Sequence, residues 1–308
     1  MQRMTTLAAA VALAGCATTR PAPADIRFLD AHSHIVAGMD VDAEIARFRE
    51  AGLAGVVIMD PDPAAIEALA KRYPDYVVPF ISAARSPEMK GLKLNAETAS
   101  RYAGLYAQGR ACGFGEIPTR LVPNPDPSDA IAIANPFRRQ VYAAANAHGV
   151  VVNVHVSLET PAVIAAVDRV AGDYPRMKLV LAHAGWSADS DTIGRLMAAH
   201  PNLYADLSVR LDPAAGWPAP GTAGPPVPNG ITILQADGSI KPDWRALIER
   251  FPDRFLFGMD VTGMGTDRVD HIPELLATAQ RALGPLPPGV QNAVAHGNLE
   301  RLLNGCGR

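Results

Sequence analysis

The chain has 308 residues, of which 48% are hydrophobic, and this is enough for a substantial core. Its 28 Lys and Arg residues nearly balance 31 Asp and Glu residues, giving a net charge of -3 with no long run of like charge. A surface of this kind has no general attraction for nucleic acids or acidic membranes. The composition therefore argues against a basic nucleic-acid-binding protein and fits a globular protein with a substantial core.

The N-terminal residues have the pattern of an export signal. Arg3 precedes an apolar stretch from Met4 to Gly15, which is shorter than the ~20 residues that span a membrane. The stretch ends in Leu13-Ala14-Gly15-Cys16, which resembles a bacterial lipobox and implies lipidation at Cys16. Residues 16–24 are small, polar and proline-containing, as in a flexible tether.

The sequence thus predicts a lipoprotein signal peptide over residues 1–15 and a protein of the bacterial cell envelope that faces the periplasm. Contact with a membrane would occur only through the lipid anchor. A plain cleaved signal, or a misassigned start codon, is the alternative.

From residue 25 onward, short apolar runs alternate with longer segments of helical apolar spacing. The predicted strands are Ile26–Asp30, Gly55–Met59, Tyr76–Ile81, Ala111–Ile117, Val150–Val156, Lys178–His183, Leu203–Leu207 and Arg254–Gly258. Predicted helices between them include Val41–Ala51, Pro63–Arg72, Ala96–Gln108, Pro136–His148, Thr160–Asp173 and Thr192–His200. This order predicts one α/β domain over residues 25–308, folded as a closed (β/α)8 TIM barrel. No GxGxxG follows the first strand, so a dinucleotide-binding fold is not indicated.

A proline- and glycine-rich segment, residues 211–241, follows the seventh predicted strand and contains a candidate hairpin, with Ile231–Leu234 leading into Ala236-Asp237-Gly238. Long connections in compact domains are usually functional loops or disordered. In a barrel this segment would overhang the C-terminal mouth, where barrel enzymes build their active sites. We expect it to govern substrate access.

The remaining cysteines, Cys112 and Cys306, lie far apart in the sequence and no CxxC is present. Two such residues do not make a disulfide framework. The sequence predicts two separate thiols, one buried and one in the exposed tail.

Side chains that bind metals occur at the ends of the predicted strands. They are His32 and His34 after the first strand, Glu116 at the fourth, His155 at the fifth, His183 at the sixth and Asp260 after the eighth. Residues i and i+2 of a strand point the same way, so the first two histidines can share an ion. Imidazole and carboxylate groups are the usual zinc donors and also suit manganese, iron or nickel. A single such histidine is more often structural, but the whole set predicts a site for one or two divalent ions, zinc first among them.

The motifs around these residues resemble the amidohydrolase superfamily, specifically its amidohydrolase-related branch. The matching stretches are DAHSH, GFGEI, NVHVS, LVLAHAGW, NLYADLS, RFLFGMD and AHGNLERLL, in the family's order. The resemblance implies that the first two histidines and Asp260 bind one ion, and that Glu116 bridges to a second ion, as in TatD-type hydrolases. His155 and His183 would hold that second ion. In mononuclear relatives, His155 joins the first ion and His183 polarises the substrate.

The catalytic roles implied are those of Asp260 and His183. Divalent ions would activate a water molecule, and Asp260 would take its proton and deliver it to the leaving group. His183 would help to polarise the scissile bond. Asp30 and Asp206 are candidate partners for the second nitrogen of the metal-binding imidazoles.

Three residues are candidates for contact with the substrate. Arg120 and Arg210 follow the fourth and seventh strands and could anchor an anionic group, although a loop arginine is more often a solvated charge. Trp186, three residues after His183, could form a pocket wall or simply pack in the core.

The sequence therefore predicts a metal-dependent hydrolase of a small amide, lactone or ester. The alternatives are a metal-dependent decarboxylase of a small unsaturated or aromatic acid, a TatD-like phosphoesterase, and a surface lipoprotein that only binds a solute or metal. The stretch Val261-Thr262-Gly263-Met264-Gly265 departs from relatives on the substrate side, so the resemblance does not identify the substrate. The oligomeric state stays open, a homo-oligomer included.

Overall fold

The computed structural model describes residues 26–35, 39–60, 62–82, 96–118, 133–186, 188–212, 231–261 and 271–306. The predicted signal peptide, the tether with Cys16, the candidate Arg120 and residues 213–230 of the long loop lie outside these residues.

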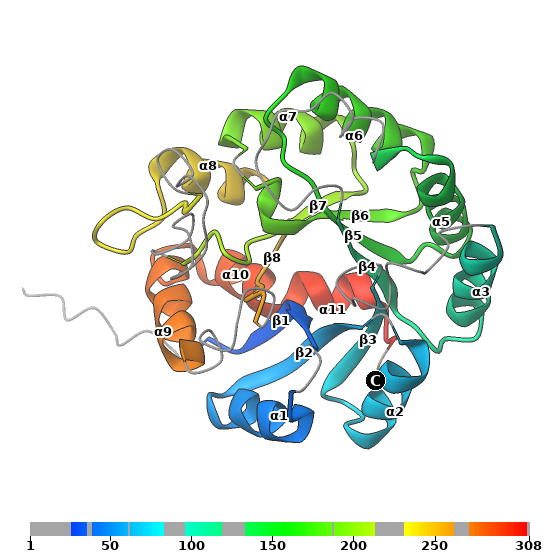
Figure 1. The fold of residues 1–308 in the computed structure, drawn as a ribbon. Helices are drawn as coiled ribbons and strands as arrows, with labels where there is room; N and C mark the ends of the chain where they lie inside the picture. Colours follow the sequence, from blue (N-terminus) through cyan, green and yellow to red (C-terminus); the bar gives the residue numbers. More distant parts are fainter. Residues whose placement is uncertain are drawn as a thin grey trace, which may run out of the picture.

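Eight parallel strands form a ring at the centre of the molecule, and helices surround it (Figure 1). The strands are β1 (Phe28–His34), β2 (Leu53–Asp60), β3 (Val77–Ile81), β4 (Gly113–Pro118), β5 (Val151–His155), β6 (Lys178–Leu181), β7 (Leu203–Asp206) and β8 (Phe255–Leu256). Neighbours in the sheet follow chain order from β1 to β8. A parallel bridge between Ser33 and Val261 closes the ring, together with a 2.9 Å hydrogen bond from the Ala31 amide to the Phe257 carbonyl. The predicted (β/α)8 TIM barrel is confirmed.

The helices begin where the sequence supplies caps. Asp62 and Asn135 accept hydrogen bonds from backbone amides of the first turns of α2 and α5, and a proline follows each cap. The helices are α1 (Val41–Glu50), α2 (Pro63–Arg72), α3 (Ala96–Ala107), α5 (Pro136–His148), α6 (Pro161–Asp173), α7 (Ser190–Ala199), α8 (Pro242–Arg250), α9 (Ile272–Leu283), α10 (Pro288–Asn292) and α11 (Asn298–Leu303). Across the described parts of the chain, none of these helices has the length and apolar character needed to cross a membrane.

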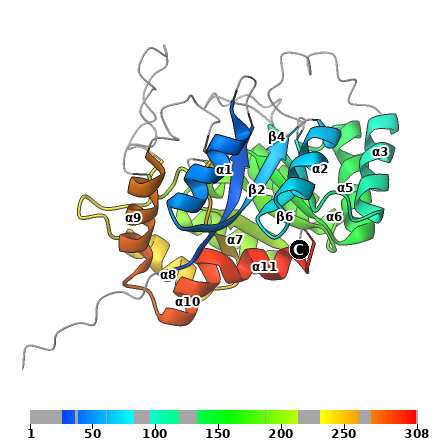
Figure 2. The same cartoon turned by 90° about the horizontal axis from the view of Figure 1, so that it is seen from below.

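The core has two layers because successive side chains of a strand point to opposite faces. Val56 and Ile58 of β2 belong to the layer between barrel and helices, whereas Val57 and Met59 belong to the layer inside the barrel. The inner layer also contains three leucines of α11, which are Leu299, Leu302 and Leu303. Figure 2 shows α10 and α11 lying across one end of the barrel, so α11 closes that end.

The hairpin predicted within the segment 211–241 is confirmed. Leu234 and Ile240 form an antiparallel bridge, and the Gln235 amide donates to the Ser239 carbonyl at 2.8 Å. This short hairpin leads directly into α8.

Cys112 and Cys306 form a disulfide, with their Cα atoms 5.5 Å apart, so the prediction of two separate thiols is wrong. Cys112 immediately precedes β4, and Cys306 follows α11, which crosses the end of the barrel. A separation of 194 residues gives no sign of this proximity, because only the closed barrel and the docked α11 create it. A disulfide that joins residues this far apart in the chain typically stabilises a fold by about 2–4 kcal/mol.

Candidate metal centre

Extra residues in β1 and β4 turn three predicted ligands towards the inside of the barrel. In β1, Asp30 pairs with Val56 and Ser33 with Ile58, so three steps along β1 match two along β2. β4 has the same irregularity, because its residues 114 and 117 pair with residues 152 and 154 of β5. Such bulges re-aim side chains and are frequent next to active sites. They place His32, His34 and Glu116 in one buried group.

The other predicted ligands come from β5 and from turns at the ends of β6 and β8. His155 is the last residue of β5 and is buried. β6 ends two residues earlier than predicted, at Leu181, and His183 lies in the following 3-10 turn with φ of 53°. Asp260 has the same φ of 53°. Residues other than glycine rarely adopt this left-handed conformation, and such strain concentrates at functional sites.

Four donor atoms from β1, β4 and the segment after β8 form a first cluster. The Nε2 atoms of His32 and His34 lie 3.1 Å apart. Glu116 Oε2 lies 3.8 and 3.6 Å from these two atoms, and Asp260 Oδ1 lies 3.8 and 3.5 Å from them. Tetrahedral zinc with bonds of 2.0–2.1 Å holds its donors about 3.3 Å apart, so the spacing suits a divalent ion.

A second cluster forms around the other oxygen of Glu116. Its Oε1 lies 2.6 Å from His155 Nδ1 and 3.3 Å from His183 Nε2, and these two nitrogens are 3.2 Å apart. The two oxygens of one carboxylate therefore face two different sets of donors, as a carboxylate that bridges two ions would.

The charges of the centre also suit a cation. Glu116, Asp206 and Asp260 are all at least 95% buried and gather around four imidazoles. Among the residues that the structure describes, Asp260 Oδ1 is buried and has no hydrogen-bond partner. A buried carboxylate oxygen without a donor is costly unless a cation or a donor satisfies it. The residues present fit a divalent metal ion.

The carboxylates hold their charged forms because imidazoles surround them. Burial would raise the pKa of Asp206, but His32 lowers it to about 2. Burial would also raise the pKa of Glu116, and His155 instead holds it well below its usual value. Burial would lower the pKa of His32, but Asp206, followed by Glu116, raises it well above the ordinary value. These electrostatics favour ionised carboxylate donors.

Asp206 orients the rings of His32 and His183 through the nitrogen of each ring that faces away from the donor clusters, directly for His32 and through Ser208 for His183. Its Oδ2 accepts from His32 Nδ1 at 3.0 Å and from Asn153 Nδ2 at 2.9 Å. Ser208 donates to Asp206 Oδ1, and the Ser208 oxygen lies 2.8 Å from His183 Nδ1. Each imidazole can therefore donate through Nδ1, which leaves its Nε2 directed at the centre as a donor atom for an ion.

Sequence reasoning missed Asn153 and Ser208 as members of this network. Asn153 lies two residues before His155 on the same face of β5, so strand alternation could have found it, whereas Ser208 lies beyond the end of β7, where alternation gives no signal. Asp30, predicted as an imidazole partner, instead accepts from the His32 and Met259 amides and from the Ser33 hydroxyl. It therefore fixes the backbones of β1 and of the segment after β8.

Glycine is required where ligand-bearing segments approach each other closely. Gly115 has φ of 146°, and a Cβ there would lie 2.7 Å from the Asn153 carbonyl oxygen. A Cβ on Gly258 would lie 3.2 Å from the His32 Cβ and 3.1 Å from the Ser208 Cβ. The glycines of GFGEI and RFLFGMD thus allow the segments around the centre to pack.

Asp206→Asn should weaken metal affinity about 10- to 100-fold, because an amide holds the His32 ring less firmly than a carboxylate does. Competition with a fluorescent zinc chelator measures this affinity. The matched control is Asp168→Asn, which changes an exposed carboxylate 2.7 Å from His200 Nε2. Equal affinities in the two variants would contradict the orienting role.

The predicted substrate residues have different surroundings. The Trp186 ring lies against His155 and His183, with centroid distances of 5.2 and 5.3 Å. Arg210 is buried, donates to the Ala188 carbonyl at 3.0 Å and stacks 4.5 Å from the Trp244 ring centroid. Burial lowers the pKa of Arg210 to about 9. Its role towards a substrate stays a prediction, as does that of Arg120.

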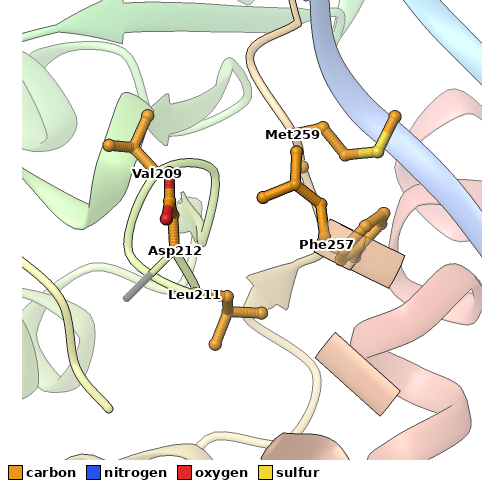
Figure 3. Close-up of a pocket in the computed structure, with 7 residues that line it drawn as sticks. Val209, Leu211, Asp212, Phe257 and Met259 are labelled. Atoms are coloured by element: carbon orange, nitrogen blue, oxygen red, sulfur yellow. The ribbon is translucent and has the colours of Figure 1, made fainter. Parts of the chain in front are cut away.

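A small pocket lies outside the ligand clusters (Figure 3). Phe257 and Met259, which line it, belong to the layer between barrel and helices, and Leu275 contributes from α9. The other lining residues are Val209, Leu211, Asp212 and Gly258. None of the predicted ligands lines this pocket, so we interpret it as a packing recess.

Comparison with known proteins identifies the family of this chain. A family model described as "Amidohydrolase" matches residues 17–305. No curated protein matches the chain.

Solved structures of similar fold include a probable 2-pyrone-4,6-dicarboxylic acid hydrolase from Acinetobacter baumannii with bound citric acid. It has a TM-score of 0.58 and 11% identity, and the match covers 91% of this chain and 100% of that one. A Burkholderia multivorans amidohydrolase with bound zinc has a TM-score of 0.57 and 18% identity, covering 90% and 99%. A TatD homologue from Escherichia coli has a TM-score of 0.61 and 15% identity, covering 91% and 99%. At these identities the likeness shows the fold alone.

Proposed function

Because this chain belongs to the amidohydrolase family and is a hydrolytic enzyme, we propose that it cleaves a small amide, lactone or ester at a centre of two divalent ions. One observation carries the proposal: Glu116 presents Oε2 to His32 and His34 and presents Oε1 to two other imidazoles. A carboxylate placed in this way would hold two ions close together.

Zinc is the proposed ion, with manganese, iron or nickel as alternatives, because nitrogen and carboxylate donors suit all four. When bound, divalent ions lower the pKa of a coordinated water towards ~7 and polarise the scissile carbonyl.

The chain's own residues handle the proton. Asp260 is buried and lies at the first cluster through Oδ1, so its carboxylate is placed to accept the proton of the attacking water. The same carboxylate then returns the proton to the leaving group. His183 is fixed through Nδ1 by Ser208, which keeps Nε2 directed at the centre. Asp206, held in turn by Asn153, keeps the His32 ring in the orientation that binding requires.

The proposal is tested by removing the metal with a chelator and then restoring it. Turnover of a panel of small amides, lactones and esters is measured at each stage. We expect chelator-treated protein to lose turnover and to regain it with zinc or manganese, with about two ions per chain at full activity. Turnover that persists after metal content has fallen to background would overturn the proposal.

The same preparation separates the alternatives. A decarboxylase would release carbon dioxide from an unsaturated or aromatic acid and needs a single ion, which leaves the second cluster without a role. A TatD-like phosphoesterase would cleave small phosphoesters. A binding protein would hold metal without turning over any substrate class. The two-sided placement of Glu116 favours hydrolysis, including that of phosphoesters, over decarboxylation.

We also propose that the protein works outside the cytoplasm and is anchored to a membrane through Cys16. The Cys112–Cys306 disulfide supports export, because disulfides persist in oxidising compartments. In cells that process lipoproteins, wild type should require detergent for extraction, and Cys16→Ser should be recovered without detergent. Identical fractionation of the two proteins would contradict the anchor.

A further inference from the structure

An aromatic side chain covers the second donor cluster. Trp186 follows His183 by three residues, in a turn where its own φ is 59°. The indole is tilted 39° to the His155 ring and lies edge-on to the His183 ring, at 77°. A tryptophan placed against two of the imidazoles therefore borders any substrate that reaches this side of the centre.

Apolar residues back this tryptophan. Trp186 is partly exposed and packs against Val209 and Ile231, which are 8% and 2% exposed and form a cluster separate from the two core layers. Val209 comes from the turn after β7 and has φ of 64°. Trp186, Val209 and Ile231 thus form an apolar wall beside a centre that is otherwise made of imidazoles and carboxylates.

The indole also has an unused hydrogen-bond donor. Trp186 Nε1 is buried and finds no acceptor in the described part of the chain. A buried donor without an acceptor is costly, so a ligand oxygen that reaches this N–H is bound more tightly. Buried indole N–H groups usually have such a partner.

We propose that Trp186 determines specificity by selecting substrates whose acyl group is planar and conjugated, such as an aryl group. The indole makes an aromatic contact with the planar group, and its in-plane N–H donates to a substrate oxygen that reaches the edge of the indole. The assignment of a substrate rests on the proposed hydrolysis, whereas the recognition itself needs only the metal-loaded centre.

The first test measures binding without turnover. Benzoate and cyclohexanecarboxylate are similar in size and charge but differ in planarity, and calorimetry gives their affinities for the zinc-loaded protein. We expect benzoate to bind about 3- to 10-fold more tightly to wild type, the range of one aromatic contact. Trp186→Leu should abolish this preference.

Trp186→Phe should keep the preference for benzoate but weaken binding of both acids, because the ring stays and the N–H is lost. The matched control is Trp244→Phe on α8, where the tryptophan stacks on Arg210. That variant should bind both acids as wild type does. Metal content is measured for every variant.

The second readout is spectroscopic. Cobalt(II) at the centre should quench the fluorescence of Trp186, and this quenching should disappear in Trp186→Phe but persist in Trp244→Phe. No benzoate preference in wild type, or a preference that survives Trp186→Leu, would overturn the proposal. A benzoate preference in a protein that hydrolyses nothing would instead refute the hydrolysis and leave recognition by Trp186 standing.

Discussion

Replacing Glu116 with glutamine should lower the metal content from about two ions per chain to about one and slow hydrolysis about 100-fold or more. The substitution preserves the size of the side chain but leaves one oxygen and one amide nitrogen, and a protonated amide nitrogen is not a metal ligand. Since the two oxygens of Glu116 face different clusters, one cluster must lose a donor. Elemental analysis of chelator-free protein measures the ion count, and kcat/KM measures the rate.

The matched control for this experiment is Glu67→Gln. Glu67 is also paired with cations, Arg110 and Lys71, but its surroundings are the protein surface. This variant should keep both the ion count and the rate of wild type. About one ion in wild type and in Glu116→Gln alike would mean a mononuclear centre, and decarboxylation would then be as well supported as hydrolysis.

The barrel and most of its polar centre could be predicted from the sequence because local patterns carry them. Strands that are apolar on both faces, helices with proline and cap residues, and polar residues at strand ends are all readable within short windows. His155 is an example, since it closes the apolar run VVNVH and lies at the end of β5. Parallel strands then bring such ends together at one mouth of the barrel.

The parts that could not be predicted depend on contacts distant in sequence. The bulge in β1 appears only from its pairing with β2, and the strand itself continues to His34, four residues beyond the predicted end at Asp30. The orienting role of Asp206 requires β7 to lie near β1, which only closure of the ring produces. The disulfide depends in the same way on α11 docking across the barrel end.

The second large effect is expected for Asp260→Asn, which should reduce kcat about 10²- to 10⁴-fold while the protein still binds its ions at saturating zinc. Asparagine keeps an oxygen where Oδ1 now lies 3.5 Å from His34 Nε2, so the first cluster retains a neutral donor. The amide cannot accept a proton from water, so transfer to the leaving group is lost. KM should change much less than kcat, because the substitution removes proton transfer rather than substrate contacts.

Asp60→Asn is the appropriate control, since Asp60 is likewise a buried aspartate at the end of a barrel strand. Its Oδ1 accepts from the Asp62 amide at 2.7 Å, next to the start of α2, and burial raises its pKa. A neutral asparagine should therefore be tolerated there with near-normal kcat.

Should Asp260→Asn with a full complement of ions match the wild-type kcat, another group must take the proton. His183 would be the next candidate, because its Nε2 lies 3.3 Å from Glu116 in the second cluster. Comparison of the two aspartate variants thus separates loss of a proton acceptor from loss of a buried charge.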